Sequence, residues 1–234
     1  MAMTKHIGIV CCSAEGAALC YRTVCVEGAG HLGAHAHPEV SMHTPSLAEY
    51  VACLERSDVA GIAELMLRSA DKLAKIGADF LICPDNTIHQ ALDQVLPRSP
   101  LPWLHIAEVV AGEAKRRGFK RLAVTGTKWL VGSDVYPSRL GDAGIACERP
   151  SESECAEINR IIMDELVNSE FKPDSTTYIQ GVIARLRDNG CDGVVLGCTE
   201  LPLILDDAKS PLPTLDSTRL LARAALAHAV DGAD

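Results

Sequence analysis

The spacing of apolar residues divides the chain into short buried runs and longer segments of helical periodicity. Short apolar or alternating runs predict strands over residues 7–10, 40–43, 80–83, 102–106 and 193–196, with another from residue 121. Apolar residues three and four positions apart predict helices over residues 17–26, 59–76, 108–117, 156–167, 176–187 and 219–230. Alternating strands and helices with short connections predict an α/β protein whose parallel sheets are covered on both faces.

The second half of the chain repeats the order of elements of the first half. Ser13 and Thr127 follow corresponding strands, as do Asp85 and Cys198, and the offset is roughly 113 residues in both cases. This register predicts an internal duplication into two similar Rossmann-like lobes, related by a pseudo-twofold axis with the active site in the cleft between them. We expect lobes over residues 1–110 and 111–211, with a C-terminal helix in 212–234 packing back on the first lobe.

Two strand-to-helix junctions carry the clearest chemistry. Asp85 follows the apolar run 80–83, and Cys198 follows the apolar run 193–196. The carboxyl ends of parallel strands form the edge where α/β proteins bind ligands, and helix N-termini point at that edge. A thiol at a helix N-terminus has its thiolate stabilised, so we expect Cys198 to titrate nearer neutrality than an ordinary cysteine.

Composition limits the classes of partner. The chain has 234 residues, a net charge of −9 and a pI near 5.4, which argue against nucleic acid or an anionic membrane as partner. Ten cysteines occur without a hydrophobic signal segment before them, so we expect reduced thiols and a cytoplasmic location. No run approaches the roughly 20 apolar residues that cross a bilayer.

Three further patterns have simpler interpretations. Gly28, Gly30 and Gly33 match a dinucleotide-binding fingerprint but follow a helix instead of a strand, so no nucleotide site is predicted. A group of histidines lacks metal-ligand spacing, and we predict no metal site at His31, His35, His37 and His43. The small residues of 11–16 predict a loop that holds an anion at the next helix N-terminus, with unreactive thiols.

Sequence motifs at these junctions resemble the aspartate/glutamate racemase superfamily, and most closely its amino-acid racemase branch. The resemblance rests on Asp85-Asn86-Thr87-Ile88-His89, on Gly197-Cys198-Thr199-Glu200-Leu201 and on the strand before Thr127, and it covers nearly the whole chain. It implies exchange of a substrate α-proton between two cysteines without any cofactor. It also implies that Asn86, Thr87 and Thr199 bind the substrate carboxylate.

The chain departs from that pattern at the first cysteine, where Asp85 stands in a Pro-Asp-Asn-Thr sequence. Cys83 lies two residues too early on a strand-to-turn path to take its place. We therefore predict that Asp85 and Cys198 form an unequal acid/base pair on opposite faces of a small carboxylate. A single thiol is also compatible with decarboxylation of a substituted malonate, with isomerisation of an alkene diacid, or with a carboxylate-binding protein that has no activity.

The remaining expectations concern binding. Removing a proton beside a carboxylate builds negative charge, and donors are expected from the Ser13 loop, from Thr127 and from the Thr199-Glu200 turn. The resemblance suggests Arg56 and Arg160 for a distal carboxylate, although helical arginines are usually solvated. Glu157 falls where racemases of acidic amino acids tend to carry lysine. The resemblance also implies a homodimer, and Trp129 and Tyr136 are candidates to close the site.

Overall fold

The computed structural model describes residues 4–231, which divide into two compact units. One contains the residues up to 106 together with those from 218 onward, and the other contains residues 107–217. Within the described residues each unit has one four-stranded parallel sheet. The strand orders are β2-β1-β3-β4 and β6-β5-β7-β8, so the two sheets have the same topology. The predicted α/β class, parallel sheets and repeated order are confirmed.

The first unit contains four short strands together with helices of very different lengths. Its strands are β1 (Ile7–Val10), β2 (Val40–His43), β3 (Phe80–Ile82) and β4 (Trp103–Leu104). Its helices are α1 (Ala14–Leu32), α2 (Leu47–Glu55), α3 (Val59–Lys75), α4 (Leu92–Val95) and nearly all of α10 (Ser217–Asp231). A 3-10 turn, Thr87–Ala91, precedes α4.

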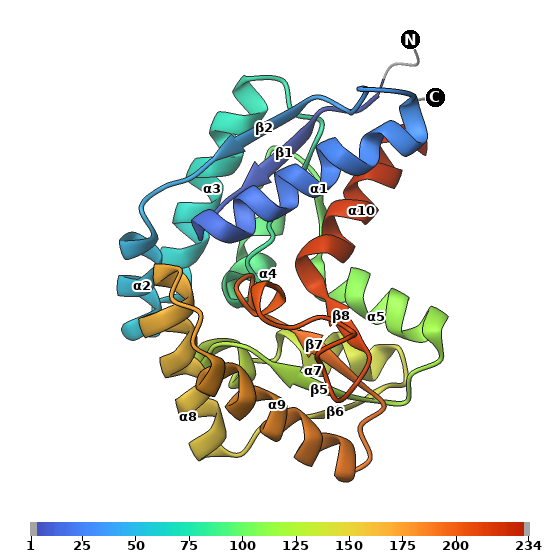
Figure 1. Ribbon diagram of the computed structural model, residues 1–234. Coiled ribbons are helices and arrows are strands. Elements are labelled where there is room, and N and C mark those ends of the chain that lie inside the picture. Colours follow the sequence, from blue (N-terminus) through green and yellow to red (C-terminus); the bar gives the residue numbers. More distant parts are fainter. Residues whose placement is uncertain (1–3, 232–234) are drawn as a thin grey trace. The chain divides into compact units, whose positions relative to one another are not determined.

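Strand β1 lies in the middle of the first sheet, between β2 and β3. All residues of β1 and β3 are buried, as expected for parallel strands covered on both faces. Gly8 permits close packing, because a Cβ atom there would lie 2.6 Å from Leu81 Cδ2. Helix α10 runs beside α1, and an ion pair between Arg223 and Glu27 joins the two helices (Figure 1). The adjacency of β1 and β3 brings together residues about 70 positions apart.

The second unit repeats this plan with shorter helices. Its strands are β5 (Arg121–Thr125), β6 (Ala146–Glu148), β7 (Gly193–Leu196) and β8 (Thr214–Asp216). Its helices are α5 (Ile106–Arg117), α6 (Lys128–Val131), α7 (Val135–Asp142), α8 (Glu152–Arg160) and α9 (Pro173–Asp188). A five-residue π-helical turn, Ile161–Glu165, follows α8, and a 3-10 turn, Leu201–Leu203, follows β7.

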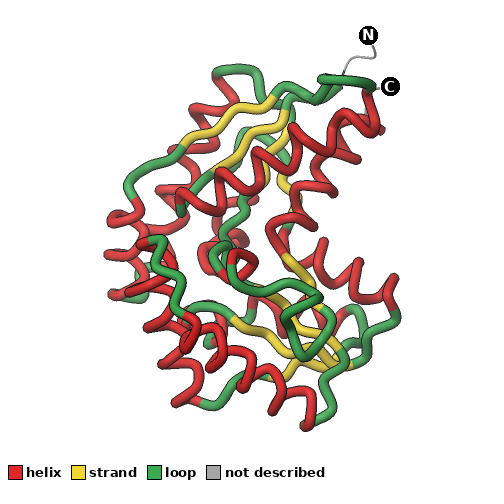
Figure 2. Tube along the Cα trace, viewed as in Figure 1, coloured by secondary structure: helices red, strands yellow, loops and turns green. Residues whose placement is uncertain are grey.

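The strands of the second unit lie side by side, with α9 packed against them (Figure 2). Strand β5 pairs with β6 and β7, and β7 pairs with β8. Because β8 belongs to this sheet, residues 212–217 belong to the second unit, whereas the sequence-based boundary at 212 assigned them to the first. The last helix, from residue 218, belongs to the first unit.

Candidate functional site

Asp85 lies three residues after β3, at the carboxyl edge of the first sheet, and only 8% of its surface is exposed. Its carboxylate accepts two main-chain N–H groups from the loop after β1. The Cys12 N–H donates to Oδ2 at 3.0 Å, and the Ser13 N–H lies 3.2 Å from both carboxylate oxygens. Since β1 and β3 are neighbours in the sheet, their two following loops meet here.

The loop at residues 11–16 was predicted to hold an anion, and within the first unit that anion is the protein's own Asp85. Ser13 is the N-cap of the 19-residue helix α1, and its Oγ accepts the N–H of Gly16 at 3.2 Å. A carboxylate at this position receives hydrogen bonds and the favourable potential of a helix N-terminus together. Ser13 therefore contacts Asp85 directly through its main chain.

The main-chain carbonyl of Asp85 is also held. His89 Nδ1 lies 3.0 Å from this oxygen, and the Cys83 thiol donates to it at 3.7 Å. The other ring nitrogen of His89 accepts the Ile106 N–H at 3.4 Å, and the His89 ring is tilted against His105 with centroids 4.9 Å apart. Both histidines are buried. The Asp85 residue is thus fixed at both its side chain and its main chain.

Two thiols near Asp85, those of Cys11 and Cys83, are fully buried, and their pKa values lie above the usual range. Burial raises the pKa of Cys11 to about 12, with the charge of Asp85 adding to the effect. Burial also raises the pKa of Cys83 well above its usual value, and Asp85 again contributes. The prediction that Cys83 does not replace the missing cysteine agrees with this environment.

Tyr50, on α2, is a further buried group that no sequence pattern singled out. Its phenol is fully buried and has no hydrogen-bond partner within the described residues. Burial raises its pKa, and the nearby Cys83, Cys12 and Asp85 raise it further. Asp85 therefore lies in a buried environment of low polarity, which strengthens each hydrogen bond to its carboxylate.

Cys198 lies two residues after β7, at the corresponding edge of the second sheet, and is 8% exposed. Its thiol donates a hydrogen bond to Glu200 Oε2 at 2.8 Å. The Thr199 hydroxyl donates to the same oxygen, also at 2.8 Å. Thr199 and Glu200 are both buried, so the second unit holds a thiol, a hydroxyl and a carboxylate in one compact cluster.

Two glycines set the backbone of this cluster. Gly126 has a φ of +157°, and a Cβ atom there would lie 2.9 Å from the Gly197 carbonyl oxygen. A Cβ atom on Gly197 would lie 2.5 Å from the Thr125 carbonyl oxygen. Thr127 caps α6, where its Oγ1 accepts the Leu130 N–H at 3.2 Å, as Ser13 caps α1 in the first unit. The two loops thus have equivalent capping chemistry.

The regular α-helices expected directly after both junctions do not form there. Asp85 is followed by the 3-10 turn Thr87–Ala91, which leads into the four-residue helix α4, and Cys198 is followed by the three-residue 3-10 turn Leu201–Leu203. Cys198 therefore has Glu200 as its observed polar partner instead of a helix N-terminus. Asp85 instead accepts the N–H groups of Cys12 and Ser13, which directly precede α1 and lie far from Asp85 in sequence.

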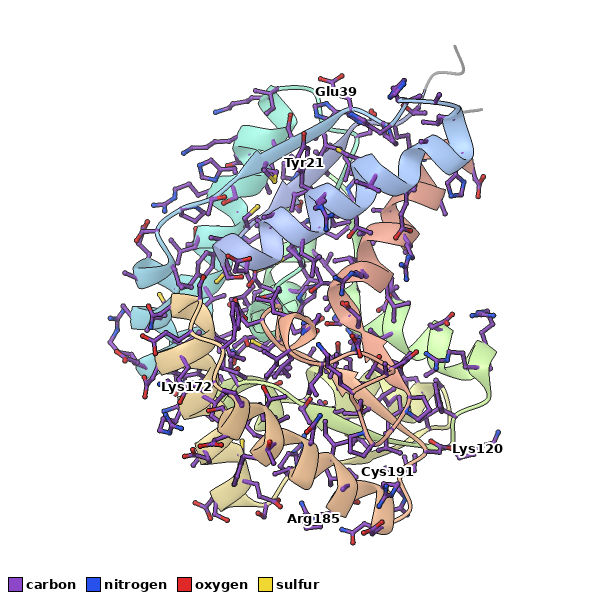
Figure 3. All side chains as sticks on the ribbon, viewed as in Figure 1. Tyr21, Glu39, Lys120, Lys172, Arg185 and Cys191 are labelled. Atoms are coloured by element: carbon purple, nitrogen blue, oxygen red, sulfur yellow. The ribbon has the colours of Figure 1, made fainter. Side chains whose placement is uncertain are left out.

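The other residues chosen from the sequence fall into two groups: polar residues that lie beside Asp85, and arginines that are paired with carboxylates of the protein itself. Asn86 is buried and Thr87 half-buried beside Asp85 in the first unit. Arg160 donates to Glu157 and to the buried Glu165, at 2.7 and 2.8 Å. Glu165 also accepts a hydrogen bond from Ser175 and lies 3.6 Å from Lys172. Figure 3 labels Lys172. Arg56 is exposed and lies 3.7 Å from Asp58.

Trp129 and Tyr136 were candidates to close the site. Tyr136 is buried in the second unit, and burial raises its pKa, so it packs as a core residue. Trp129 is half-buried, and the Lys128 ammonium lies 4.9 Å from the centre of its ring. Neither placement by itself indicates a closing movement.

The patterns set aside in the sequence also have clear positions. Gly28 and Gly30 lie inside α1 and Gly33 caps it, so the fingerprint is part of a helix terminus and not a strand-to-helix loop. Within residues 4–231 no three His, Cys, Asp or Glu side chains gather as candidate metal ligands. No helix in the same range has the length and apolar character needed to cross a bilayer.

Comparison with known proteins identifies the family. The family model described as Asp/Glu/Hydantoin racemase matches residues 9–225. The chain belongs to this family. Its relatives support an isomerase of the amino-acid racemase type, in agreement with the resemblance seen in the sequence motifs.

Individual relatives match over most of the chain. The broad specificity amino-acid racemase RacX of Bacillus subtilis (strain 168) is 26% identical over 161 residues, covering 68% of each protein. The structure of an aspartate racemase homologue from Pyrococcus horikoshii OT3 is 27% identical, with a TM-score of 0.82 over 96% of this chain and 99% of that chain. The aspartate racemase of Picrophilus torridus, at 22% identity and a TM-score of 0.74, covers 96% of this chain and 94% of its own and shares the fold.

Proposed function

We propose that this protein is an amino-acid racemase or epimerase that needs no cofactor and uses Asp85 and Cys198 as its two acid/base groups. The observation that carries the proposal is their equivalent placement. Asp85 follows β3 and Cys198 follows β7, which are the third strands of two sheets with the same order. We infer that a bound amino acid, or a related small carboxylate, has one of these groups on each face of its α-carbon.

The second unit supplies the thiol. In one direction of the reaction, the Cys198 thiolate removes the α-proton of the substrate, and the protonated Asp85 carboxyl group gives its own proton to the opposite face. Before the next turnover in this direction, Glu200 takes the Cys198 proton and releases it to solvent, and Asp85 takes up a proton from solvent. The hydrogen bond from the thiol to Glu200 Oε2 supports this role, because a proton acceptor must lie within hydrogen-bond reach of its donor. Glu200, first expected to bind substrate, is in this proposal the group that accepts the thiol proton.

The first unit supplies the carboxyl group. In the reverse direction, the Asp85 carboxylate removes the α-proton and the Cys198 thiol returns its own proton to the opposite face. The two N–H groups on Asp85 and the S–H group directed at Glu200 correspond to this starting state, with Asp85 ionised and Cys198 protonated. The first direction starts with the two protonation states exchanged, so each turnover converts one state into the other.

The intermediate needs fixed hydrogen-bond donors, because loss of the α-proton builds negative charge on the substrate carboxylate. We assign this role to Asn86 and Thr87 in the first unit and to Thr127 and Thr199 in the second. Ser13 contributes by holding Asp85. Arg160 is neutralised by two carboxylates, and Arg56 is exposed beside Asp58, so the proposal does not require a distal carboxylate on the substrate.

The test is incubation of the protein in D₂O with single enantiomers of neutral and acidic amino acids and with substituted malonates. Proton NMR reports loss of the α-proton signal and chiral chromatography reports inversion. The proposal predicts that both occur together for at least one amino acid and stop in Cys198→Ala. Cys155→Ala, which removes a half-buried thiol from α8, is the matched control and should retain activity.

Three other outcomes would each contradict the proposal. Loss of CO₂ from a malonate without amino-acid exchange would indicate a single-thiol decarboxylase. Conversion of a cis alkene diacid to its trans isomer would indicate an isomerase of that kind. Binding of carboxylates with every α-proton retained would indicate a binding protein.

A further inference from the structure

His89 has the geometry of a residue that positions Asp85. Its Nδ1 lies 3.0 Å from the Asp85 carbonyl oxygen, which can only accept a hydrogen bond, so Nδ1 carries a proton. Its Nε2 accepts the Ile106 N–H at 3.4 Å, so this nitrogen carries a lone pair. The two contacts together select one neutral tautomer for a ring that is 3% exposed.

These contacts connect Asp85 to the end of the sheet. Ile106 is the first residue of α5 and follows β4 closely, so the His89 ring bridges the loop after β3 to the junction after β4. His105, immediately before Ile106, packs against the same ring. The carbonyl of Asp85 is held from this side while its carboxylate is held by the Cys12 and Ser13 N–H groups.

The second unit makes a comparable connection by other means. Ser217, directly after β8, donates its hydroxyl to the Leu196 carbonyl oxygen at the end of β7, at 2.8 Å. Four residues after Cys198, where His89 stands relative to Asp85, the second unit has Pro202. In each unit, side-chain hydrogen bonds therefore connect the residues after the fourth strand to the end of the third strand or the loop that follows it. In the first unit the connecting side chain is an imidazole, and in the second unit it is a hydroxyl group.

We propose that His89 is the positioning residue for Asp85 in proton transfer, held neutral with its proton on Nδ1. This inference rests on the proposed function, because it concerns the carboxyl group that acts on the α-carbon. Because both ring nitrogens of His89 are directed at main-chain groups of the protein, its loss should lower kcat and leave KM nearly unchanged. A displacement of about 1 Å in a catalytic group costs on the order of 100-fold in rate.

The kinetic test uses racemisation of the best amino acid by three variants. His89→Ala should lower kcat roughly 100-fold with KM within about twofold. His89→Asn retains an N–H donor near the Nδ1 position and should recover most of the lost rate. Gln90→Ala is the matched control, because Gln90 donates to the Thr87 carbonyl in the same turn without touching Asp85, and it should remain near the wild-type rate.

A double-mutant cycle separates positioning from a general structural role. In an Asp85→Asn background, His89→Ala should cause little further loss of the residual rate, because the group it positions has already lost its function. A structural role predicts the opposite, with the two losses multiplying. Multiplying losses, or a wild-type kcat in His89→Ala, would overturn the proposal.

A measurement on the ligand-free protein distinguishes this failure from failure of the proposed function. Nitrogen-15 NMR of the His89 ring should show one neutral form with the proton on Nδ1. A proton on Nε2 would overturn the positioning role even in an active racemase. If the wild-type protein exchanges no α-proton, the proposed function fails and the positioning role of His89 fails with it, whichever tautomer is observed.

Discussion

Replacement of Asp85 tests the two hydrogen bonds that hold its carboxylate in the first unit. The side chain accepts the N–H groups of Cys12 and Ser13, whose residues are 6% and 7% exposed. In Asp85→Ala both donors lose this acceptor in a buried setting, at a cost of about 1–3 kcal/mol each. We therefore expect the free energy of unfolding of the first unit to fall by about 2–5 kcal/mol. Asp85→Asn keeps an acceptor oxygen without the charge and should cost about 1–2 kcal/mol.

Urea unfolding followed by tryptophan fluorescence isolates the unit concerned. The chain has two tryptophans, Trp103 in the first unit and Trp129 in the second, so a Trp129→Phe background makes fluorescence report on the first unit alone. Asp58→Ala is the matched control. Asp58 caps α3 by accepting the Gly61 N–H at 2.8 Å from a more exposed position, and its loss should cost about 1 kcal/mol. The stabilising role of these two hydrogen bonds would be refuted if Asp85→Ala lowered the free energy of unfolding no more than Asp58→Ala, or no more than Asp85→Asn.

Three further predictions concern other parts of the molecule. Gly197→Ala places a Cβ atom 2.5 Å from the Thr125 carbonyl oxygen, so it should lower the free energy of unfolding by about 1–3 kcal/mol and reduce activity. Gly181→Ala, on the open face of α9, should be neutral or stabilising in the same denaturation assay. Burial is the main cause that lowers the pKa of His43, and the charges of Lys72 and Arg68 lower it further. Lys72→Met should therefore raise the pKa of His43 in an NMR titration, and an unchanged pKa would contradict the effect assigned to Lys72. Arg185 (Figure 3) and the Ser151 cap lower the pKa of Glu154 from 4.5 to about 2, so this pair stabilises the fold above pH 4.5 and loses its effect as the pH falls to about 2. Arg185→Met should therefore cost about 1 kcal/mol at pH 7 and clearly less as the pH falls through about 2 in pH-dependent urea unfolding, whereas a pH-independent cost would count against the ion pair.

The fold was predictable where burial is strong and local. The apolar runs of β1, β3 and β7 and the periodicity of α3 and α9 lead directly to these elements. The two edge strands of the second sheet were missed because they are short and partly exposed: β6 reads Ala-Cys-Glu and β8 reads Thr-Leu-Asp. Residues 161–165 adopt a π-helical turn instead of continuing α8. Glu165 there is held by Arg160 and by the distant Ser175, which no local pattern reveals.

The candidate site was predictable in identity but not in its contacts. Asp85 and Cys198 stand out because each ends an apolar run at an equivalent point of the repeat. Asp-Asn-Thr and Cys-Thr-Glu also look like the starts of regular helices, yet 3-10 turns follow in both units. The partners of Asp85 lie about 70 residues away and follow only from the pairing of β1 with β3. Glu200 was chosen for substrate, and its hydrogen bond to the Cys198 thiol emerged from the structure.

The most direct test of the central claim compares Asp85→Asn and Cys198→Ala for racemisation and α-proton exchange in D₂O, after circular dichroism has shown both variants to be folded. If the carboxyl group and the thiol act on one α-carbon, each substitution should lower racemisation by at least roughly 100-fold. Wild-type turnover by either folded variant would contradict the claim.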